Sequence, residues 1–207
     1  MPIAREGWPY VGTLLVLGAL ASLRAPVLGG LLLLLGVFTL FFFRDPERAV
    51  PQEQRLVVSP ADGKIVMLCP APDGHALGPG TTQLSIFLSI FDVHVNRAPI
   101  TGRIAALEYH KGEFLPAFDD KASLRNEQNS VTLEGSGSRV MFKQIAGLIA
   151  RRIVFRKQVG DSVARGERVG LIKFGSRVDL FLPAGIDVRV RLGDRVQAGS
   201  SVLGALP

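Results

Sequence analysis

The chain has 207 residues, is 47% hydrophobic and carries a net charge of +6, which leaves room for one globular domain and little more. Its basic residues come without a helix-turn-helix, zinc-finger or aromatic RNA-binding pattern, which argues against a nucleic-acid partner. Three scattered histidines and a lone cysteine, Cys69, match no metal-ligand spacing and exclude an intramolecular disulfide, as in a reducing compartment.

Two almost uncharged runs, 8–23 and 26–43, open the chain. The second has 18 residues, at the lower limit of the roughly 20 that cross a bilayer core, and the first is shorter. We predict a hydrophobic helical hairpin within residues 1–50 that anchors the chain in a membrane. Arg5 before it and Arg44, Arg48 and Arg55 after it place the remaining chain on the cytoplasmic side. A single-span anchor and a signal peptide ending at 19–21 stay open, although the second apolar run argues against the signal peptide.

From Leu56 onward the sequence favours β structure. Short apolar or alternating runs bounded by Gly, Pro, Asn or Asp occur at 56–58, 64–68, 84–88, 130–133 and 139–142. An internal echo relates 60–66 to 99–105, since both begin with proline and place glycine three residues later. We therefore predict a mainly β catalytic domain over residues 51–207, packed as a barrel or sandwich with pseudo-symmetry.

A second repeat lies near the C-terminus. Residues 160–166 and 193–199 both read Gly-Asp-x-Val-x-x-Gly, a pattern of tight turns and short strands. This segment resembles lipoyl- and biotin-carrier domains, in which a hairpin tip about midway between such copies carries the modified lysine. Here Gly175-Ser176 stands near the place of that lysine.

A Gly-Ser bond in a strained turn allows one particular reaction. The serine oxygen can attack the preceding carbonyl, which glycine leaves open, and form an ester. Elimination from that ester splits the chain and leaves dehydroalanine, which water converts to a pyruvoyl group with loss of ammonia. Such a ketone forms a Schiff base with a substrate amine and stabilises a carbanion. Gly-Ser pairs are also common in plain turns, and Gly137-Ser138, between two strand-like runs, is interpreted as a flexible hairpin.

Two other residues are candidates for chemistry. Asp62 lies in Ser59-Pro60-Ala61-Asp62-Gly63, where the turn either aims a carboxylate or is an ordinary Asp-Gly turn. His94 ends an apolar run and is either a general acid or base, or a packed histidine bonded to backbone. His75 and His110 are expected at the surface.

Five motifs in order make a more specific pattern. They are Phe42-Phe43-Arg44-Asp45-Pro46, Ser59-Pro60-Ala61-Asp62-Gly63, Phe91-Asp92-Val93-His94-Val95-Asn96-Arg97, Asp120-Lys121-Ala122-Ser123 with Asn126-Glu127, and Phe174-Gly175-Ser176-Arg177-Val178-Asp179. From about Phe42 to the C-terminus, the chain resembles the short form of the phosphatidylserine decarboxylase proenzyme family.

The resemblance implies self-cleavage at Gly175-Ser176 into a β chain, 1–175, and an α chain, 176–207, which remain together as a heterodimer. Ser176 would become the pyruvoyl cofactor that forms a Schiff base with phosphatidylserine, and the products would be phosphatidylethanolamine and CO2. Asp62 matches the aspartate of the family's Asp-His-Ser processing machinery, in which Asp orients His and His polarises Ser. His94 matches the first histidine of the family's histidine motif, and it would also reprotonate the substrate carbon. Longer members carry a second histidine where this chain has Arg97, so either His94 serves both processing and decarboxylation or Asp62 acts on Ser176 by another route.

Several alternatives stay open. Asp120-Lys121-Ala122 copies the surroundings of a lipoylated lysine, so a membrane-tethered lipoyl-like carrier without catalytic activity is the rival class, although this lysine lies well before the repeats. The pyruvoyl chemistry could also act on an ether lipid or a soluble amino acid. Arg44, Arg97 and Arg177 are proposed phosphate partners, because guanidinium binds phosphate bidentately. No metal is expected.

Overall fold

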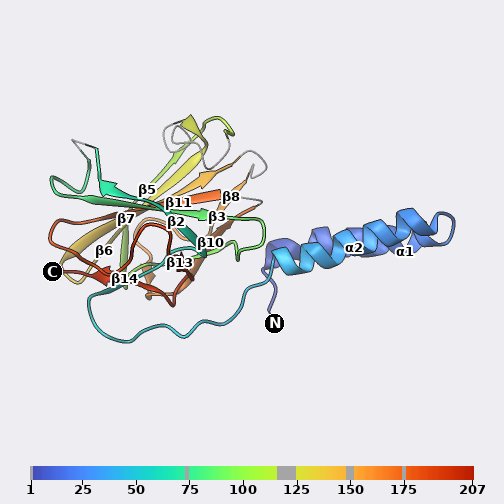
Figure 1. The fold of residues 1–207 in the computed structure, drawn as a ribbon, viewed down its shortest axis with the longest axis horizontal. Coiled ribbons are helices and arrows are strands. Elements are labelled where there is room, and N and C mark those ends of the chain that lie inside the picture. Colours follow the sequence, from blue (N-terminus) through green and yellow to red (C-terminus); the bar gives the residue numbers. More distant parts are fainter. Residues whose placement is uncertain (1, 73–74, 116–124, 148–151, 174–175) are drawn as a thin grey trace. The chain divides into compact units, whose positions relative to one another are not determined.

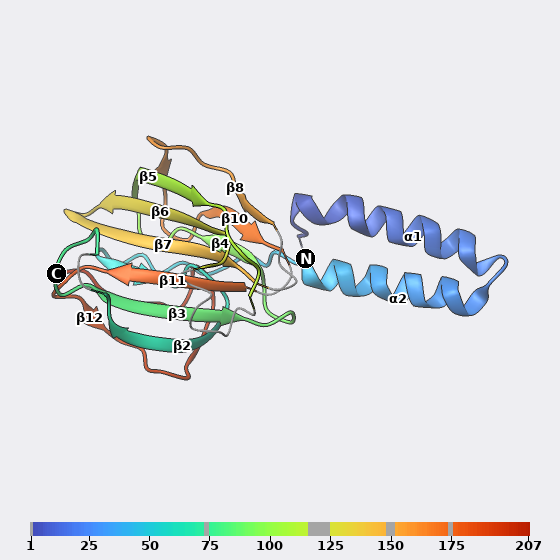
Figure 2. The same cartoon turned by 90° about the horizontal axis from the view of Figure 1, so that it is seen from above.

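A computed structural model describes residues 2–72, 75–115, 125–147, 152–173 and 176–207 (Figure 1). Two compact units make up the chain, Met1–Glu47 and Arg48–Pro207. The first is helical and the second is built of strands (Figure 2).

The N-terminal unit is the predicted helical hairpin. A 3₁₀ turn, η1 (Arg5–Gly7), leads into α1 (Trp8–Ser22), and α2 (Pro26–Phe42) follows after a short loop. Proline in the first turn of each helix suits a position whose N–H has no partner within the helix. The helices approach closely at Gly29 of α2, where a Cβ would collide with the backbone of Ser22. Within the described part of the chain, neither helix combines the length and the apolar character needed to cross a membrane.

The strands of the β unit come in fourteen described segments. In chain order they are β1 (Leu56–Val58), β2 (Gly63–Pro70), β3 (Thr82–Leu88), β4 (Val95–Arg97), β5 (Gly102–His110), β6 (Gln128–Gly135), β7 (Ser138–Ala146), β8 (Ile153–Phe155), β9 (Ser162–Val163), β10 (Arg168–Ile172), β11 (Ser176–Leu182), β12 (Asp187–Val188), β13 (Arg195–Val196) and β14 (Val202–Ala205). The five predicted runs correspond to β1, β2, β3, β6 and β7, so this part of the prediction is confirmed.

Among the described residues the strands form three antiparallel sheets. The large one has the order β13-β2-β3-β11-β7-β6-β5-β9, and the small ones have the orders β1-β14-β12 and β4-β10-β8. In Figure 1 the small sheets lie against one face of the large sheet. Buried aliphatic side chains from all three sheets form one core, which includes Val57 of β1, Ile172 of β10 and Val178 of β11.

The β unit is an internal duplication, as the two sequence echoes predicted. Strands β13, β2, β3 and β11 occupy one half of the large sheet, and β9, β5, β6 and β7 occupy the other half in mirrored order. Ile65 donates its N–H to the Asp194 carbonyl at 2.9 Å, and Ile104 donates to the Asp161 carbonyl at the same distance. The repeat at 193–199 therefore accepts a hydrogen bond from the segment 60–66, and the repeat at 160–166 accepts one from the segment 99–105. Each half of the duplication thus contains one Gly-Asp repeat.

The chain passes twice between these halves. The first crossing is the connection from β3 to β4, residues 89–94, and the second is the connection from β10 to β11. Because β10 pairs with β4 and β8 whereas β11 pairs with β3 and β7, the two described strands that flank Gly175 are not partners in a hairpin. This corrects the expected lipoyl-type hairpin. The Gly137-Ser138 segment is a true hairpin turn, with Ser136 and Gly137 both at positive φ.

Candidate active site at the two crossovers

The two crossovers lie together at one end of the large sheet. Ile172, near the end of β10, donates its N–H to the carbonyl of His94 at 3.3 Å. Ser176, the first residue of β11, stands opposite Leu88 of β3 and Ala146 of β7. Phe174 and Gly175 lie outside the described residues. The strand register therefore brings the backbone of Ser176 to the connection that carries His94.

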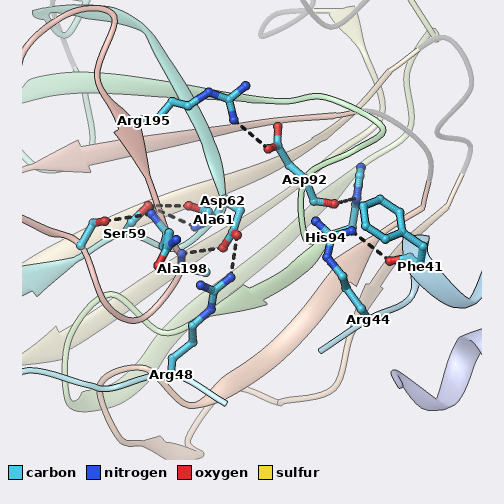
Figure 3. Close-up of polar contacts among 12 residues, drawn as sticks. Phe41, Arg44, Arg48, Ser59, Ala61, Asp62, Asp92, His94, Arg195 and Ala198 are labelled. Atoms are coloured by element: carbon cyan, nitrogen blue, oxygen red, sulfur yellow. Dashed lines mark hydrogen bonds and ion pairs between the residues drawn. The ribbon is translucent and has the colours of Figure 1, made fainter. Parts of the chain in front are cut away.

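His94 is buried, with 2% of its surface exposed. Its Nδ1 lies 2.9 Å from the carbonyl oxygen of Asp92 (Figure 3). Because a carbonyl oxygen can only accept, Nδ1 must carry the proton in this contact, and in the neutral ring Nε2 is then the acceptor. His94 is thus bonded to backbone, as one of the two alternatives expected, and its role as a general acid or base stays a prediction.

Asp92 holds the His94 connection in shape. Its carboxylate accepts the backbone N–H of Ser89 at 2.9 Å and the Ser89 hydroxyl at 2.8 Å. The backbone N–H of Asp92 returns to the Ser89 carbonyl at 3.0 Å, and Arg195 of β13 donates to the other carboxylate oxygen at 3.2 Å. Sequence analysis noted Asp92 only as a neighbour of His94.

Asp62 is also buried, and both of its oxygens have partners (Figure 3). Oδ1 accepts the N–H of Ala198 at 2.8 Å, and Oδ2 pairs with the Arg48 guanidinium at 2.6 Å. Burial raises the pKa of Asp62, while the Ala198 hydrogen bond and Arg48 oppose that rise. The negative charge of Asp92 also raises this pKa, so the two acidic groups share one electrostatic neighbourhood. In this structure His94 is oriented by Asp92, and the expected Asp62-to-His94 relay stays a prediction.

The three arginines considered as phosphate partners have separate surroundings. Arg177 is 2% exposed, and it bonds Asp179 at 2.6 Å and Ser85 at 2.8 Å on the large sheet. Arg97 is buried and donates to the carbonyl of Gly166, the last residue of the first Gly-Asp repeat, at 2.9 Å.

Arg44 belongs to the N-terminal unit, where it donates to the carbonyl of Phe41 and lies over the ring of that residue. The partners of Arg97 and Arg177 make these two residues parts of the scaffold. Of the other histidines, His110 is exposed, whereas His75 is half-buried and stacks on Phe181.

Buried amides form hydrogen bonds on β7 and the strands near it, and no role was predicted for them from the sequence. Gln144 donates to Asn96 at 2.9 Å and accepts from Asn129 at 2.9 Å, and all three are buried. Asn126 donates to the carbonyl of Ala146, the residue opposite Ser176, at 2.7 Å. The signal was present, because Asn129 and Gln144 are polar residues within runs that otherwise predict buried strands. Asp120 and Lys121 lie outside the described residues.

The described residues fit a group derived from Ser176. A new chain end at this position would be the first residue of a strand that is paired on both sides, so the end would be held in a fixed place. The Nε2 atom of His94 supplies a base in the adjoining connection.

Comparisons with known proteins agree with this geometry. The profile of the phosphatidylserine decarboxylase family matches residues 35–204. Proteins named phosphatidylserine decarboxylase proenzyme are similar over nearly their whole length. The one from Symbiobacterium thermophilum is 48% identical, with 99% of this chain and 96% of the relative covered. The one from Solibacter usitatus is 50% identical over 98% and 96%, and that from Geobacter metallireducens is 46% identical over 100% and 97%.

Proposed function

The chain belongs to the phosphatidylserine decarboxylase family, and from that premise we propose that it cuts itself at Gly175-Ser176 and uses the resulting pyruvoyl group to convert phosphatidylserine to phosphatidylethanolamine and CO2. Proenzymes of this family use a pyruvoyl group derived from serine. The enzyme is thus a carboxy-lyase and not a lipoyl-like carrier. What remains to be assigned is the role of each residue.

One observation carries the assignment of Ser176. The crossover that ends at Ser176 and the crossover that contains His94 are held together by the bond from Ile172 to His94 and by the pairing of Ser176 with Leu88. The competing Gly137-Ser138 pair closes a hairpin within one half of the duplication, where no such partner connection adjoins it in the described residues.

His94 is the proposed base for self-cleavage. Since its Nδ1 proton is engaged by Asp92, its Nε2 can take the proton of the Ser176 hydroxyl as that oxygen attacks the Gly175 carbonyl. The pyruvoyl group supplies an electron sink for decarboxylation. In that second reaction Nε2 of His94 returns a proton to the substrate carbon that has lost CO2. A single histidine thereby serves both reactions, in agreement with Arg97 at the place of the family's second histidine.

Asp62 is proposed to act on processing through its charge. Its ionised form is costly in this buried place, as the raised pKa indicates, yet Arg48 and the Ala198 N–H keep it in position. A carboxylate of this kind stabilises a neighbouring imidazolium when His94 takes the serine proton.

The two chains produced by cleavage are proposed to remain one molecule. The α chain, 176–207, would contribute β11 to the middle of the large sheet, β13 to its edge beside β2, and β14 beside β1. These pairings and the shared core hold it to the β chain, 1–175. The heterodimer should therefore separate only when the protein is unfolded.

The family is membrane-associated, and we assign this chain to the cytoplasmic side of the cell membrane. The apolar surfaces of α1 and α2, with Leu28 and Leu34 more than half exposed, favour contact with lipid. Arg5 and Arg44 flank these helices and suit anionic headgroups. The substrate is expected to be phosphatidylserine held in that membrane.

The intact mass of the purified full chain under denaturing conditions tests the cleavage. We expect two fragments, 1–175 and 176–207, the smaller one carrying a ketone that blocks Edman sequencing. Ser176→Ala should remain uncut, and conversion of phosphatidylserine to phosphatidylethanolamine should be lost with it. A cut after Gly137, or a single uncut wild-type chain with full decarboxylase activity, would overturn the assignment.

A further inference from the structure

The connection between β3 and β4 exposes two large apolar side chains. Ile90 is 39% exposed and Phe91 is 62% exposed. They lie between Leu88, which pairs with Ser176, and His94. Adjacent exposed apolar side chains that are rimmed by polar residues are typical of a surface that receives an apolar partner.

The turn that presents them is held firmly. Asp92 accepts both the N–H and the hydroxyl of Ser89, and its own N–H returns to the Ser89 carbonyl. These three bonds close the turn below Ile90 and Phe91. Ile90 and Phe91 are the two residues between Ser89 and Asp92, so both lie at the tip of a turn whose backbone is fixed.

Basic side chains stand next to this tip. Arg195 of β13 reaches Asp92, as Figure 3 shows, and its side chain is 71% exposed. Lys64 of β2 stands opposite Arg195 in the strand register and is also exposed. An apolar tip beside two cations is the composition of a surface that binds anionic phospholipid, in which acyl chains lie beneath negative headgroups.

We propose that Ile90 and Phe91 insert into the surface of an anionic phospholipid bilayer, with Lys64 and Arg195 at the headgroups. This docking tip (Ile90 and Phe91) belongs to the β unit. It rests on the proposed function, because it brings the bilayer to the crossovers where His94 and Ser176 act. A lipid headgroup then reaches the site without the whole lipid leaving the bilayer.

The direct test places a tryptophan at the tip of the full chain. Trp8 is the sole tryptophan of the sequence, so W8F/F91W carries one fluorophore, and W8F/V159W is its control. Val159 is 58% exposed, a fraction similar to the 62% of Phe91, and it lies just before the first Gly-Asp repeat. With vesicles of phosphatidylcholine and phosphatidylglycerol, we expect a blue shift and quenching by brominated acyl chains at position 91 and neither at 159. Equal behaviour at both positions overturns the proposal.

A kinetic test separates docking from catalysis. Phe91→Ser should lower turnover of phosphatidylserine in bilayers by about 10-fold, the loss expected when one large apolar side chain no longer inserts. Turnover of a short-chain phosphatidylserine dispersed as monomers should stay unchanged, and Val159→Ser should match wild type on both substrates. Equal losses of Phe91→Ser on both substrates would contradict docking. If the wild-type chain neither cut itself nor decarboxylated, the proposed function would fail, while the fluorescence result would still report on the tip.

Discussion

Asp62 and Thr101 occupy equivalent positions in the two halves of the β unit and accept equivalent hydrogen bonds. Oδ1 of Asp62 accepts the N–H of Ala198 at 2.8 Å, and the hydroxyl of Thr101 accepts the N–H of Arg165 at 3.0 Å. Ala198 and Arg165 are the matching residues of the two Gly-Asp repeats. One side-chain oxygen that accepts a backbone N–H is therefore enough to hold this turn. The second oxygen of Asp62, which threonine lacks, is the one that meets Arg48.

This equivalence predicts that Asp62→Thr keeps the fold and loses processing. The threonine hydroxyl can accept the Ala198 N–H, as Thr101 does for Arg165, and the cost of burying a charge disappears. Because Arg48, whose side chain is 11% exposed, loses its carboxylate, we expect the free energy of unfolding to fall by up to about 3 kcal/mol with the fold retained, while cleavage at Gly175-Ser176 slows at least about 10-fold. Denaturant unfolding and the intact mass over time measure the two effects.

Thr101→Ala is the matched control, because it removes the turn bond of the other half without touching a carboxylate. It should cost about 1 kcal/mol of stability and leave cleavage at the wild-type rate. Normal cleavage in Asp62→Thr would show that Asp62 serves only its turn.

Much of the fold was predictable because its signals are local. Alternating apolar residues marked β2 and β3, and the glycines of the two repeats marked turns that the structure places at positive φ, such as Gly160 and Gly193. Which half each strand joins is not local. The alternation of apolar side chains along β10 and β11 does not indicate which strands they pair with. The two strands were therefore expected to form a hairpin, although they belong to different sheets.

The site was predictable where its chemistry depends on residue type and unpredictable where it depends on partners. His94 and Gly175-Ser176 were found from motifs, but the bond between Nδ1 and the Asp92 carbonyl requires a backbone conformation that no motif reports. Arg177 was considered a phosphate partner because guanidinium binds phosphate bidentately, whereas the structure buries it against Asp179. Its spacing from Asp179 was the overlooked signal, because residues two apart on a strand share a face and can pair there.

Arg48 should control the pH dependence of processing. Burial raises the pKa of Asp62, and Arg48 opposes the rise, so Arg48→Met should raise that pKa further. Because the ionised carboxylate is the form that supports cleavage, the acid limb of the cleavage rate should move to higher pH. Rates measured across the acid range report this shift. Arg139→Met, which removes an exposed ion pair with Glu134, should leave the profile in place, and an unmoved limb in Arg48→Met would contradict the role of Asp62.

The same raised pKa has a consequence for stability. A carboxyl that binds its proton more tightly in the folded state stabilises the fold at low pH, and this contribution is lost as pH rises from the ordinary value of 3.8 through the folded pKa. The wild-type free energy of unfolding, relative to that of Asp62→Asn, should therefore fall as pH increases across this window. Chemical denaturation at a series of pH values measures the difference. A relative stability that rises with pH would mean that Arg48 and Ala198 outweigh burial.

His94→Ala should leave the chain uncut. The substitution removes Nε2, the base that the Asp92 carbonyl orients, whereas the Ser89–Asp92 turn keeps its own bonds. Intact mass should show a single chain, with phosphatidylethanolamine production lost as well. His110→Ala changes an exposed histidine and should cleave normally. Full turnover in a processed His94→Ala enzyme would remove both proposed roles.

Arg177 should increase the free energy of unfolding and strengthen the association of the α and β chains. Its ion pair with Asp179 is buried, with side-chain exposures of 2% and 0%, and it lies on β11 directly after the cleavage site. Arg177→Met leaves a buried carboxylate without its cation, which costs roughly 3–5 kcal/mol, whereas Arg139→Met at the exposed pair should cost about 1 kcal/mol or less. Arg177→Met/Asp179→Leu should recover most of the loss, since it removes both charges.

Thermal unfolding measures the stabilities, and size-exclusion chromatography in mild denaturant shows whether the α chain separates first in Arg177→Met. A stability loss as small as that of Arg139→Met would mean that Asp179 is held by its other neighbours, such as Gln83, and that Arg177 is available for a ligand.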